Sequence, residues 1–561
     1  MNYIVNTEEM RRADENTIFC FGVPQLVLME RAALSARDFM MQEWKELFTT
    51  SVRILIAVGN GNNGGDGVAL ARLFYLQGHQ VTVLVSGDQE KYSPALKSQM
   101  QILEKYRAES EKQQNMKLRQ ALHIITDDMW MTAHEQKKES YDLVVDALFG
   151  VGLSRPVEGI CKEKIEWLNG LTAKKAALDI PSGVSAKDGS VPGEAFLADL
   201  TVTFGFVKAG MLLYPGKEYC GAIKTAEIGI TEESFLGEYP AGVTLDRTDE
   251  AQKECLDTFL YRKPDSHKGS YGKVLLAAGS KRTPGAALLA GKAAFRSGTG
   301  MVQLVTSPEN RDLVLSALPE IMYQELTEDT DWERLLDWCD VVVAGPGIGQ
   351  ERFAEKSLEK IMTIVSEKEP RKPVVLDADG LNLVASSERL YELVKAYTAL
   401  GGIVIMTPHM AEFSRLLHCD LKELQTGRME KQKRYVRESG VILVSKDAAT
   451  VVCYADEEDS FHYYINQTGN SGMATAGSGD VLSGIMGAFA ALTAMQQEKE
   501  SKKDDPAKRM QRKTAYFEAA YRAVYVHGLA GDRAVQKYGE TAMKAGDMIH
   551  ALPEIFPGFV G

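Results

Sequence analysis

The sequence is poor in cysteine and carries no excess of basic residues. Its seven cysteines are dispersed over 561 residues and include no Cys-x-x-Cys pair. An odd, scattered set predicts reduced thiols in a cytoplasmic protein, not a disulfide framework or a zinc cage. Lys and Arg number 64 against 77 Asp and Glu, a formal net charge of −13. This acidic balance argues against a nucleic-acid-binding chain and against a polybasic membrane anchor.

Long apolar runs are also missing. The first 19 residues, MNYIVNTEEMRRADENTIF, carry charge throughout and lack the apolar core of a secretory signal. Residues 473–495 are weakly charged, but Asp480 and several glycines interrupt them. Their helical part is shorter than the roughly 20 residues of a membrane span, so we predict a buried helix. With 25% charged and 45% hydrophobic residues, the composition is that of a globular protein with several domains.

Short β-branched segments alternate with amphipathic segments along the chain. Ten predicted strands are residues 52–58, 80–86, 141–149, 200–206, 273–280, 301–307, 340–347, 372–379, 402–408 and 441–446. Near-continuous apolar strands followed by helical patterns indicate parallel sheets covered on both faces, so we predict the α/β class. Residues 231–254 mix Gly, Pro and charge without a sustained strand pattern, as linkers do. We therefore expect two domains, residues 1–235 and 240–561, joined by an exposed linker.

The first predicted strand leads into a glycine-rich motif, GNGNNGGDG at residues 59–67, and then into a helix. The motif fits the G-x-G-x-x-G fingerprint of dinucleotide-binding folds in its strand–turn–helix setting. Asp66 does not fit, because a carboxylate near a helix N-terminus opposes a bare pyrophosphate. With Asn62 and Asn63, it indicates side-chain ligands for a cation or a hydroxyl-bearing molecule. The alternative is a plain turn whose Asp caps the helix.

Two later strand ends point to the same crevice. VVDALFGVGLSRP ends a strand in Asp146 and continues into a Gly-rich turn, and AALDIPSG ends another strand in Asp179, shortly before Ser182. In open parallel sheets, ligands bind beyond the carboxyl ends of the strands. Hard oxygen ligands without Cys or His favour an alkali or alkaline-earth ion over zinc or copper.

These three motifs, in this order, resemble the NAD(P)H-hydrate epimerase family, whose domain is Rossmann-like. LMERAA and VKAGMLLYPGKEYCG extend the resemblance over residues 1–230. It implies that Asn63, Asp146 and Ser182 hold a potassium ion and that Asp179 contacts the substrate as a catalytic residue. Two runs of residues would bind the hydrated nicotinamide nucleotide with Asp179: Asn62, Asn63, Gly64, Gly65 and Asp66, and Gly150, Val151, Gly152, Leu153, Ser154, Arg155 and Pro156.

The stretch NSGMATAGSGDVLSGIMGAF, residues 470–489, carries the chemistry of the second half. Its AGSGD turn opens an apolar helix, and the backbone N–H groups of such a turn can bind an anion that forms during phosphoryl transfer. Asp480 follows the turn and can accept a proton from a substrate hydroxyl, as small-molecule kinases require. The alternative is that Asp480 only caps a buried helix. His409, just beyond a strand, indicates a ligand contact, with a structural histidine as the alternative.

Other Gly-rich pieces follow strands, where they let a flat ligand approach the backbone. HKGSYGKVLLAAGS, TPGAALLAGKAAFRSGTG, GPGIG, LDADGLN, TPHMAEFSRL, SKDAATVV and AGSGD together resemble the NAD(P)H-hydrate dehydratase family, of the ribokinase-like superfamily, over residues 262–557. The resemblance implies that the hydrated nucleotide is contacted by Ala286, Gly347, His409 and Asp480. It implies an adenine-nucleotide site made of Lys446, Asp447, Ala448, Ala449, Thr450 and Gly479. Asp447 departs from the family's Lys-Gly-Ala, and we expect its carboxylate to alter nucleotide affinity.

The whole chain resembles the bifunctional NAD(P)H-hydrate repair enzymes. The resemblance implies that the first domain interconverts the R and S hydrates of NADH and NADPH. The second would dehydrate the S form with ADP and magnesium, releasing AMP and phosphate. We expect a cytoplasmic homo-oligomer with neither nucleic acid nor membrane as a partner, and a solvated insertion at residues 496–513. Two alternatives stay open: a ribokinase-like kinase of a small vitamin precursor, and a non-catalytic nucleotide-binding protein.

Overall fold

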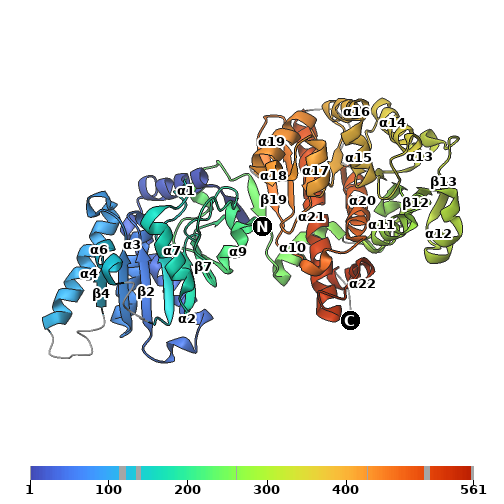
Figure 1. Cartoon of the computed structure of the whole chain (residues 1–561). Coiled ribbons are helices and arrows are strands. Elements are labelled where there is room, and N and C mark those ends of the chain that lie inside the picture. The colour runs from blue at the N-terminus through green and yellow to red at the C-terminus, as the bar shows by residue number, and fades with distance from the viewer. Residues whose placement is uncertain are drawn as a thin grey trace. The chain divides into compact units, whose positions relative to one another are not determined.

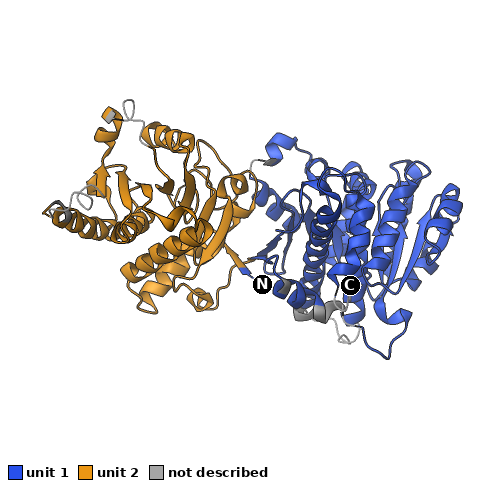
Figure 2. Ribbon diagram, turned by 90° about the horizontal axis from the view of Figure 1, so that it is seen from below, with its two compact units in different colours: residues 1–2, 243–561 blue, residues 3–242 orange. Residues whose placement is uncertain are grey.

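The computed structural model describes residues 2–112, 122–133, 140–153, 155–260, 262–425, 427–497 and 506–556. The chain divides into two compact units, coloured separately in Figure 2. Residues 3–242 form the N-terminal unit, and residues 243–561 form the C-terminal unit together with the first two residues. Each unit has a largely parallel sheet with helices packed against it (Figure 1), so the predicted α/β class is confirmed.

The N-terminal unit alternates strands and helices. Its elements are β1 (Asn2–Val5), α1 (Thr7–Phe19), α2 (Gln25–Glu43), β2 (Arg53–Val58), α3 (Asn62–Leu76), β3 (Gln80–Val85), α4 (Pro94–Lys112), β4 (Leu122–Ile125), α6 (Asp127–Ala133), β5 (Leu143–Ala147), α7 (Gly159–Gly170), β6 (Lys174–Leu178), β7 (Leu200–Phe204), β8 (Val207–Lys208), α8 (Ala209–Leu212), α9 (Gly216–Cys220) and β9 (Ala222–Ala226). Seven described strands form one sheet in the order β4-β3-β2-β5-β6-β7-β9, with parallel neighbours throughout. β1 pairs with β8, also in parallel.

The strands of this sheet are apolar because helices cover both of its faces. In β2, the side chains of Ile54, Ile56 and Val58 pack with α2, α3 and α4. Leu55 and Ala57, which alternate with them, pack with α6 and α7 on the opposite face. The strand order reverses between β2 and β5, and at such a switch point the loops beyond the strands leave a crevice for a ligand. The motif GNGNNGGDG follows β2, and VVDALFG forms the end of β5 and the turn after it.

The C-terminal unit repeats this alternation on a larger sheet. Its elements are β10 (Gly242–Thr244), α10 (Asp249–Leu260), β11 (Lys273–Ala277), α11 (Pro284–Arg296), β12 (Met301–Thr306), α12 (Arg311–Ala317), β13 (Met322–Glu325), α13 (Trp332–Trp338), β14 (Val341–Ala344), α14 (Arg352–Glu367), β15 (Val374–Leu376), α15 (Asp379–Ser386), α16 (Glu388–Ala399), β16 (Val404–Met406), α17 (Met410–Leu416), α18 (Leu421–Gln425), α19 (Arg428–Ser439), β17 (Ile442–Ser445), β18 (Val451–Ala455), β19 (Phe461–Ile465), α20 (Ser478–Gln497), α21 (Pro506–Tyr538) and α22 (Ala545–Ile555). The strand order is β13-β12-β11-β14-β15-β16-β17-β18-β19-β10. The strands from β13 to β17 in this order are parallel, and β18 and β19 extend them in antiparallel fashion.

Helix α20 lies in the core of the C-terminal unit, against α11, α21 and β14. Glycines permit this close approach. A Cβ atom on Gly484 would overlap the carbonyl oxygen of Ala290 in α11, and one on Gly487 would lie 2.6 Å from Cγ2 of Val343 in β14. Among the described residues, α20 alone is long and apolar enough to cross a membrane, but 78% of its apolar window is buried inside the structure. It is the buried helix that the sequence predicts, but it is longer than expected, because it begins at Ser478, before Asp480, and runs for 20 residues.

The segment between the two sheets is more ordered than a linker. It contains β10 and α10, and Phe235, Leu245 and Leu256 are buried. Phe235 packs in the core of the N-terminal unit, whereas Leu245 and Leu256 pack in that of the C-terminal unit. The expectation of an exposed linker is therefore wrong for these three residues, because each unit takes apolar residues of the segment into its own core, whereas others such as Glu232 and Arg247 are exposed.

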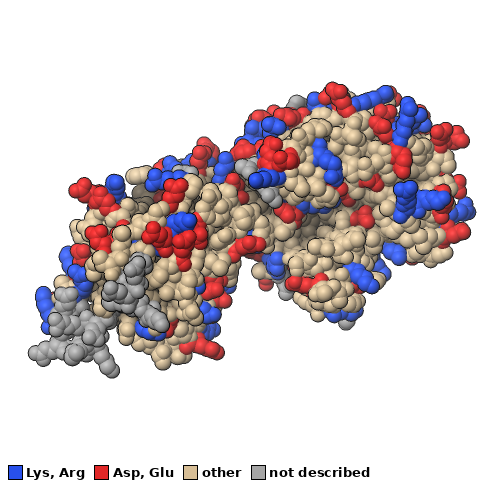
Figure 3. Space-filling view, viewed as in Figure 1, with Lys and Arg blue, Asp and Glu red and all other residues tan. Residues whose placement is uncertain are grey.

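Charged residues of both signs are interspersed over the face seen in Figure 3, with no large area of one sign. In the mixed-charge run 496–513, α20 ends at Gln497 and α21 begins at Pro506. Residues 498–505 of that run lie outside the described part of the chain. On the face seen in Figure 3, a phosphate-bearing ligand would have to be held by local groups rather than by the field of a basic surface.

Candidate active sites

A cavity of about 600 Å³ opens beyond the carboxyl ends of β2 and β5. The predicted site residues that line it are Asn62, Asn63, Asp66, Gly150, Val151, Gly152, Leu153, Arg155 and Asp179. Apolar residues of α1 and α2, such as Met10 and Leu28, form other walls. Pro156 is not among the lining residues, and Ser154 lies outside the described residues. The three motifs of the first half thus meet around one space.

Gly64 and Gly65 serve the packing of α3 and do not line this cavity. A Cβ atom on Gly64 would overlap the carbonyl oxygen of Gly59, and one on Gly65 would lie 2.5 Å from Cε of Met29. The N-cap of α3 is Gly61, with no hydrogen bond from a side chain. The alternative that Asp66 caps this helix is therefore wrong, and its carboxyl group faces the cavity instead.

Asp146 and Ser182 lie together at the ends of β5 and β6. The carboxylate of Asp146 accepts hydrogen bonds from the backbone N–H groups of Leu148 (3.1 Å) and Ser182 (2.7 Å) and from the Ser182 hydroxyl (2.8 Å). Asp146 is fully buried. Burial raises the pKa of Asp146 to about 6, and the three hydrogen bonds oppose this rise. A buried carboxylate that is bonded only by neutral donors suits a nearby cation.

Asn63 supplies a second oxygen for such an ion. Its side-chain N–H₂ donates to the carbonyls of Phe149 (2.8 Å) and Leu178 (3.2 Å). The side-chain oxygen of Asn63 is left buried without a hydrogen-bond partner. Ser182 shares the carbonyl of Phe149 at 3.4 Å, which links the two groups. The orphaned oxygen and the buried carboxylate are hard ligands, and the site fits an alkali cation.

Three carboxyl groups face the same cavity: Asp14 from α1, Asp66 from α3 and Asp179 after β6. The fully buried Lys208 forms an ion pair with Asp179 and donates to the Thr203 hydroxyl at 2.8 Å. Asp179 has φ 65°, a left-handed conformation that its surroundings must impose. Burial first, then the charges of Asp179 and Asp14, raises the pKa of Asp66 well above its ordinary value. Sequence reasoning missed Lys208, which stands in VKAGM directly after a predicted strand.

In the C-terminal unit, the AGSGD turn leads into α20, and Gly477 has φ 89°. The N–H groups in the first turn of a helix have no acceptor within the helix. Here that of Ser478 donates to the carbonyl of Thr475 at 3.3 Å, which leaves the neighbouring N–H groups of the turn for an anion. Asp480 lies in that first turn. Burial first, then the charge of Asp377, raises the pKa of Asp480 to about 6, while Lys446 lowers it. Asp480 is therefore ionised at neutral pH and basic enough to accept a proton during a reaction.

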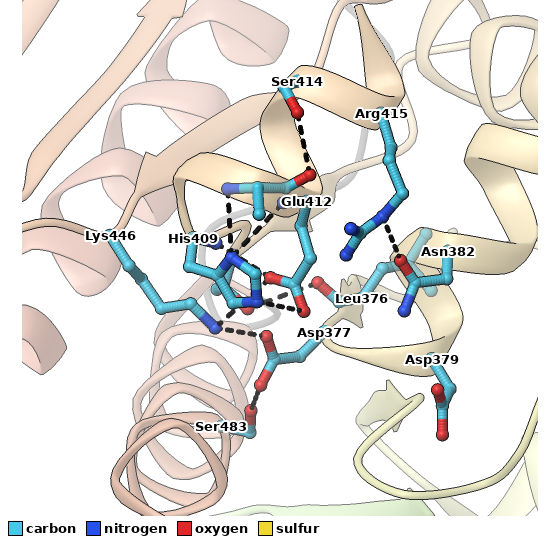
Figure 4. A network of polar contacts seen from close by, with 12 residues as sticks. Leu376, Asp377, Asp379, Asn382, His409, Glu412, Ser414, Arg415, Lys446 and Ser483 are labelled. Carbon is cyan, nitrogen blue, oxygen red and sulfur yellow. Dashed lines mark hydrogen bonds and ion pairs between the residues drawn. The ribbon is translucent and has the colours of Figure 1, made fainter. Parts of the chain in front are cut away.

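A charged network beside this turn joins β15, β17 and α20 (Figure 4). Nζ of Lys446 lies 2.6 Å from Oδ1 of Asp377, whose Oδ2 accepts a hydrogen bond from Ser483 at 2.5 Å. Burial opposes ionisation, but Lys446 and the hydroxyl bond hold the pKa of Asp377 below its ordinary value. A Cβ atom on Gly479 would stand 3.5 Å from the same Nζ, so two predicted nucleotide ligands meet here. Sequence reasoning missed Asp377 and Ser483, although LDADGLN follows a predicted strand.

His409 caps α17, the structural role that the sequence left open. Its Nδ1 accepts hydrogen bonds from the backbone N–H groups of Ala411 (3.2 Å) and Glu412 (3.3 Å). The backbone N–H of His409 in turn donates to the side-chain carboxylate of Glu412 at 2.8 Å. Partial burial lowers the pKa of His409, and Glu412 opposes this. The neutral ring then carries its proton on Nε2, which lies 3.3 Å from Oε1 of Glu412, while the side chain is 52% exposed.

Ala286 and Gly347 are brought into contact by two loops that follow β11 and β14. Gly347 has φ 59°, and a Cβ atom there would lie 3.0 Å from Cβ of Ala286 and 2.8 Å from Oγ1 of Thr283. The Thr283 hydroxyl donates to the carbonyl of Gly347 at 2.6 Å. No side chain fits at residue 347, so glycine lets the loop after β14 pack directly against Thr283 and Ala286.

Asp447 is paired with Arg428 at 2.5 Å. Arg428 also donates to the carbonyl and the hydroxyl of Ser445, each at 3.3 Å. Burial lowers the pKa of Arg428, and Asp447 opposes this shift. Thr450 closes the turn by donating to the carbonyl of Asp447 at 3.1 Å, with Ala448 and Ala449 between them. The carboxylate that departs from the family pattern is thus balanced by a buried cation that sequence reasoning missed.

Two α/β units, each with a polar site at the carboxyl edge of a parallel sheet, define a nucleotide-binding enzyme with two active sites. Residues 25–210 match the family described as YjeF-related protein N-terminus, and residues 274–554 match the NAD(P)H-hydrate dehydratase family. The chain belongs to the bifunctional NAD(P)H-hydrate repair enzymes, and the resemblance drawn from its motifs is confirmed.

Relatives match almost the whole chain. The bifunctional NAD(P)H-hydrate repair enzyme Nnr of Escherichia coli (strain K12) is 32% identical over 550 residues, 98% of this chain and 93% of that protein. The enzyme of the same name from Thermofilum pendens is 31% identical over 561 residues, 98% of this chain and 95% of that protein. A crystal structure of the ADP/ATP-dependent NAD(P)H-hydrate dehydratase from Bacillus subtilis, co-crystallised with ATP and Mg²⁺, covers 55% of this chain and 96% of its own. It has a TM-score of 0.42 and 28% identity.

Proposed function

We propose that the N-terminal unit, residues 3–242, interconverts the R and S hydrates of NADH and NADPH, and that the C-terminal unit, residues 243–561, dehydrates the S hydrate. The family matches support this division, because residues 25–210 fall in the first unit and residues 274–554 in the second. The alternatives, a vitamin-precursor kinase and a non-catalytic binding protein, lose support because the bifunctional relatives match both units.

The position of Asp480 beside the Gly477–Gly479 turn carries the proposal for dehydration. Hydroxide is a poor leaving group, so the hydroxyl of the hydrate must first become a phosphate ester. Asp480 takes the hydroxyl proton as the oxygen attacks the terminal phosphorus of ADP, and AMP departs. The N–H groups of the turn and Lys446, fixed by Asp377, stabilise the charge on the phosphoryl oxygens. Phosphate then leaves the ring, which loses a proton from the adjacent carbon and restores the double bond.

The dehydratase site would take magnesium together with ADP. Across the described residues, no three His, Cys, Asp or Glu side chains converge on a site that could hold a metal. Mg²⁺ commonly binds through substrate phosphates and keeps several waters, so the phosphates of ADP can supply the missing ligands. Bound in this way, it neutralises phosphate charge during transfer.

In the N-terminal unit, Asn63, Asp146 and Ser182 would hold potassium. The orphaned oxygen of Asn63 and the buried carboxylate of Asp146 support this assignment. The ion would balance the charge of Asp146 and stabilise the loop that starts at Phe149, which lines the cavity.

We also infer a homo-oligomer in the cytoplasm whose ligands are small molecules. The cysteines are free thiols, as expected in a reducing compartment. Phe19, Phe21, Leu26 and Val27, at the end of α1 and the start of α2, expose apolar surface that a second copy could cover. Light scattering of the purified chain measures the oligomeric state.

Separately prepared R and S hydrates of NADH test the function. With ADP and magnesium, the S hydrate should regain the absorbance of reduced nicotinamide through the C-terminal unit alone. The R hydrate should regain this absorbance faster with both units active than with the C-terminal unit alone, because the N-terminal unit first converts it to the S hydrate. An S hydrate that stays unconverted would contradict the dehydratase proposal, and a phosphorylated product that persists would favour the kinase.

A further inference from the structure

We propose that Asp66 is the general acid of epimerisation and that Asp179, held by Lys208, is the base that acts with it. This assignment rests on the epimerase function proposed above. Both carboxyl groups line the cavity of about 600 Å³ at the switch point of the sheet, and they come from different elements. Asp66 belongs to α3, which follows β2, whereas Asp179 directly follows β6.

Asp179 is held in place by an ion pair. One of its oxygens, Oδ1, is paired with the ammonium group of Lys208. The same ammonium group donates a hydrogen bond to the Thr203 hydroxyl at 2.8 Å. Its other oxygen, Oδ2, would lie 3.5 Å from a Cβ atom on Gly150. It therefore faces the Gly-rich turn after β5, which also lines the cavity. An anchored carboxylate with one oxygen turned to a ligand cavity is placed to take a proton from water.

Asp66 has the opposite surroundings. Within the described residues its carboxyl group makes no hydrogen bond, so no donor stabilises its charge. The charged groups around the cavity are Asp14 and Arg11 of α1, Asp179 after β6 and Arg155 after β5, besides Lys208. Burial first, and then the two aspartates, raise the pKa of Asp66. Asp66 thus holds its proton more firmly than an ordinary carboxyl group, whereas Asp179 is ion-paired with Lys208, and such contrasting surroundings are how acid and base roles are assigned.

The chemistry of the hydrate suits this pair. Hydration of a dihydronicotinamide places the hydroxyl on the ring carbon next to the nitrogen. Asp66 gives its proton to that hydroxyl, and the C–O bond breaks as the nitrogen lone pair forms a C=N bond, which leaves an iminium and one water. Water then adds to the other face, its oxygen bonds to the carbon, and Asp179 takes the proton. The nitrogen regains its lone pair, the configuration is inverted, and exchange with solvent resets both carboxyl groups.

The variant Asp66→Asn tests the acid role, because the amide keeps the shape but cannot act as the acid. With R hydrate of NADH as substrate, we expect the kcat of epimerisation to fall about 10²–10⁴-fold and KM to change much less. Asp66→Glu, which restores an acid, should recover at least part of the lost kcat. The KM for the R hydrate, which depends on an intact cavity, reports whether the N-terminal unit is folded.

Asp14→Asn is a second, independent test, because it removes a negative charge that raises the pKa of Asp66. The alkaline limb of the kcat profile should move to lower pH, a change that a purely structural Asp66 would not produce. If Asp66→Asn epimerises within fivefold of wild type, or if Asp14→Asn leaves the limb in place, the acid role is overturned. A wild-type chain that never epimerises the R hydrate would instead overturn the proposed function itself.

Discussion

Replacing Asp480 with asparagine should stop dehydration while nucleotide binding is retained. The amide keeps the shape of the carboxylate, so the first turn of α20 and the N–H groups of Gly477–Gly479 stay in place. It cannot accept the proton of the substrate hydroxyl. Loss of a general base costs about 10²–10⁴ in rate, which corresponds to about 3–5 kcal/mol of transition-state stabilisation.

The pH dependence gives the same prediction a second readout. Asp480 must be ionised to act, and its pKa is about 6. Below that value the ionised fraction, and with it kcat, falls about tenfold per pH unit, so at pH 5 about a tenth of the plateau should remain. Asp377→Asn should move this limb to lower pH. It removes a negative charge that raises the pKa of Asp480 and releases Lys446, which lowers that pKa.

The assay uses the S hydrate of NADH with saturating ADP and magnesium, and follows the absorbance of reduced nicotinamide between pH 5 and 8. Calorimetric titration with AMP measures nucleotide binding and also shows that the C-terminal unit of the variant is folded. The assigned role would be refuted if Asp480→Asn kept more than half of the wild-type kcat. A wild-type rate that stays flat from pH 5 to pH 7 would refute it equally.

Three further predictions concern separate parts of the molecule. The units should be separable, so that residues 1–242 epimerise and residues 243–561 dehydrate only the S hydrate; two inactive pieces beside an active whole chain would contradict this. In wild type, epimerisation should be faster in potassium than in a bulky organic cation, and Asp146→Ala should abolish that difference; equal wild-type rates would exclude the ion. Asp447→Gly should leave Arg428 buried without its carboxylate and lower the free energy of unfolding by about 1–3 kcal/mol, and an unchanged Tm would show that the pair adds no stability.

The strands and the first site could be predicted because their signals are local in the sequence. A strand buried on both faces must be an apolar run, and the polar residues directly after it must stand at the edge of the sheet. The linker was misjudged because Phe235 and Leu256 are isolated apolar residues within polar sequence, and only packing shows which core receives them.

The charged partners of the site residues could not be predicted. Asp377 and Lys446 are 69 residues apart, and Asp179 and Lys208 are 29 apart. No periodicity links such residues, because their contact depends on strand order and on which turn leaves each strand. A motif therefore indicates that a carboxylate stands at the sheet edge. Whether that carboxylate is free to react or committed to a lysine depends on the tertiary fold.

The close packing of α20 against α11 and β14 makes the position of Asp480 depend on residues in the apolar interior. At Gly484 and Gly487 a single added methyl group has no room, so any other residue must drive the helix away from α11 or β14. A helix moves as a stiff rod, and Asp480 stands only four residues before Gly484, about 6 Å along the axis. A displacement of about 1 Å at a reacting group can cost a hundredfold in rate. The absence of a side chain at Gly484 and Gly487 thus determines where the carboxylate of Asp480 stands, although neither glycine contacts it.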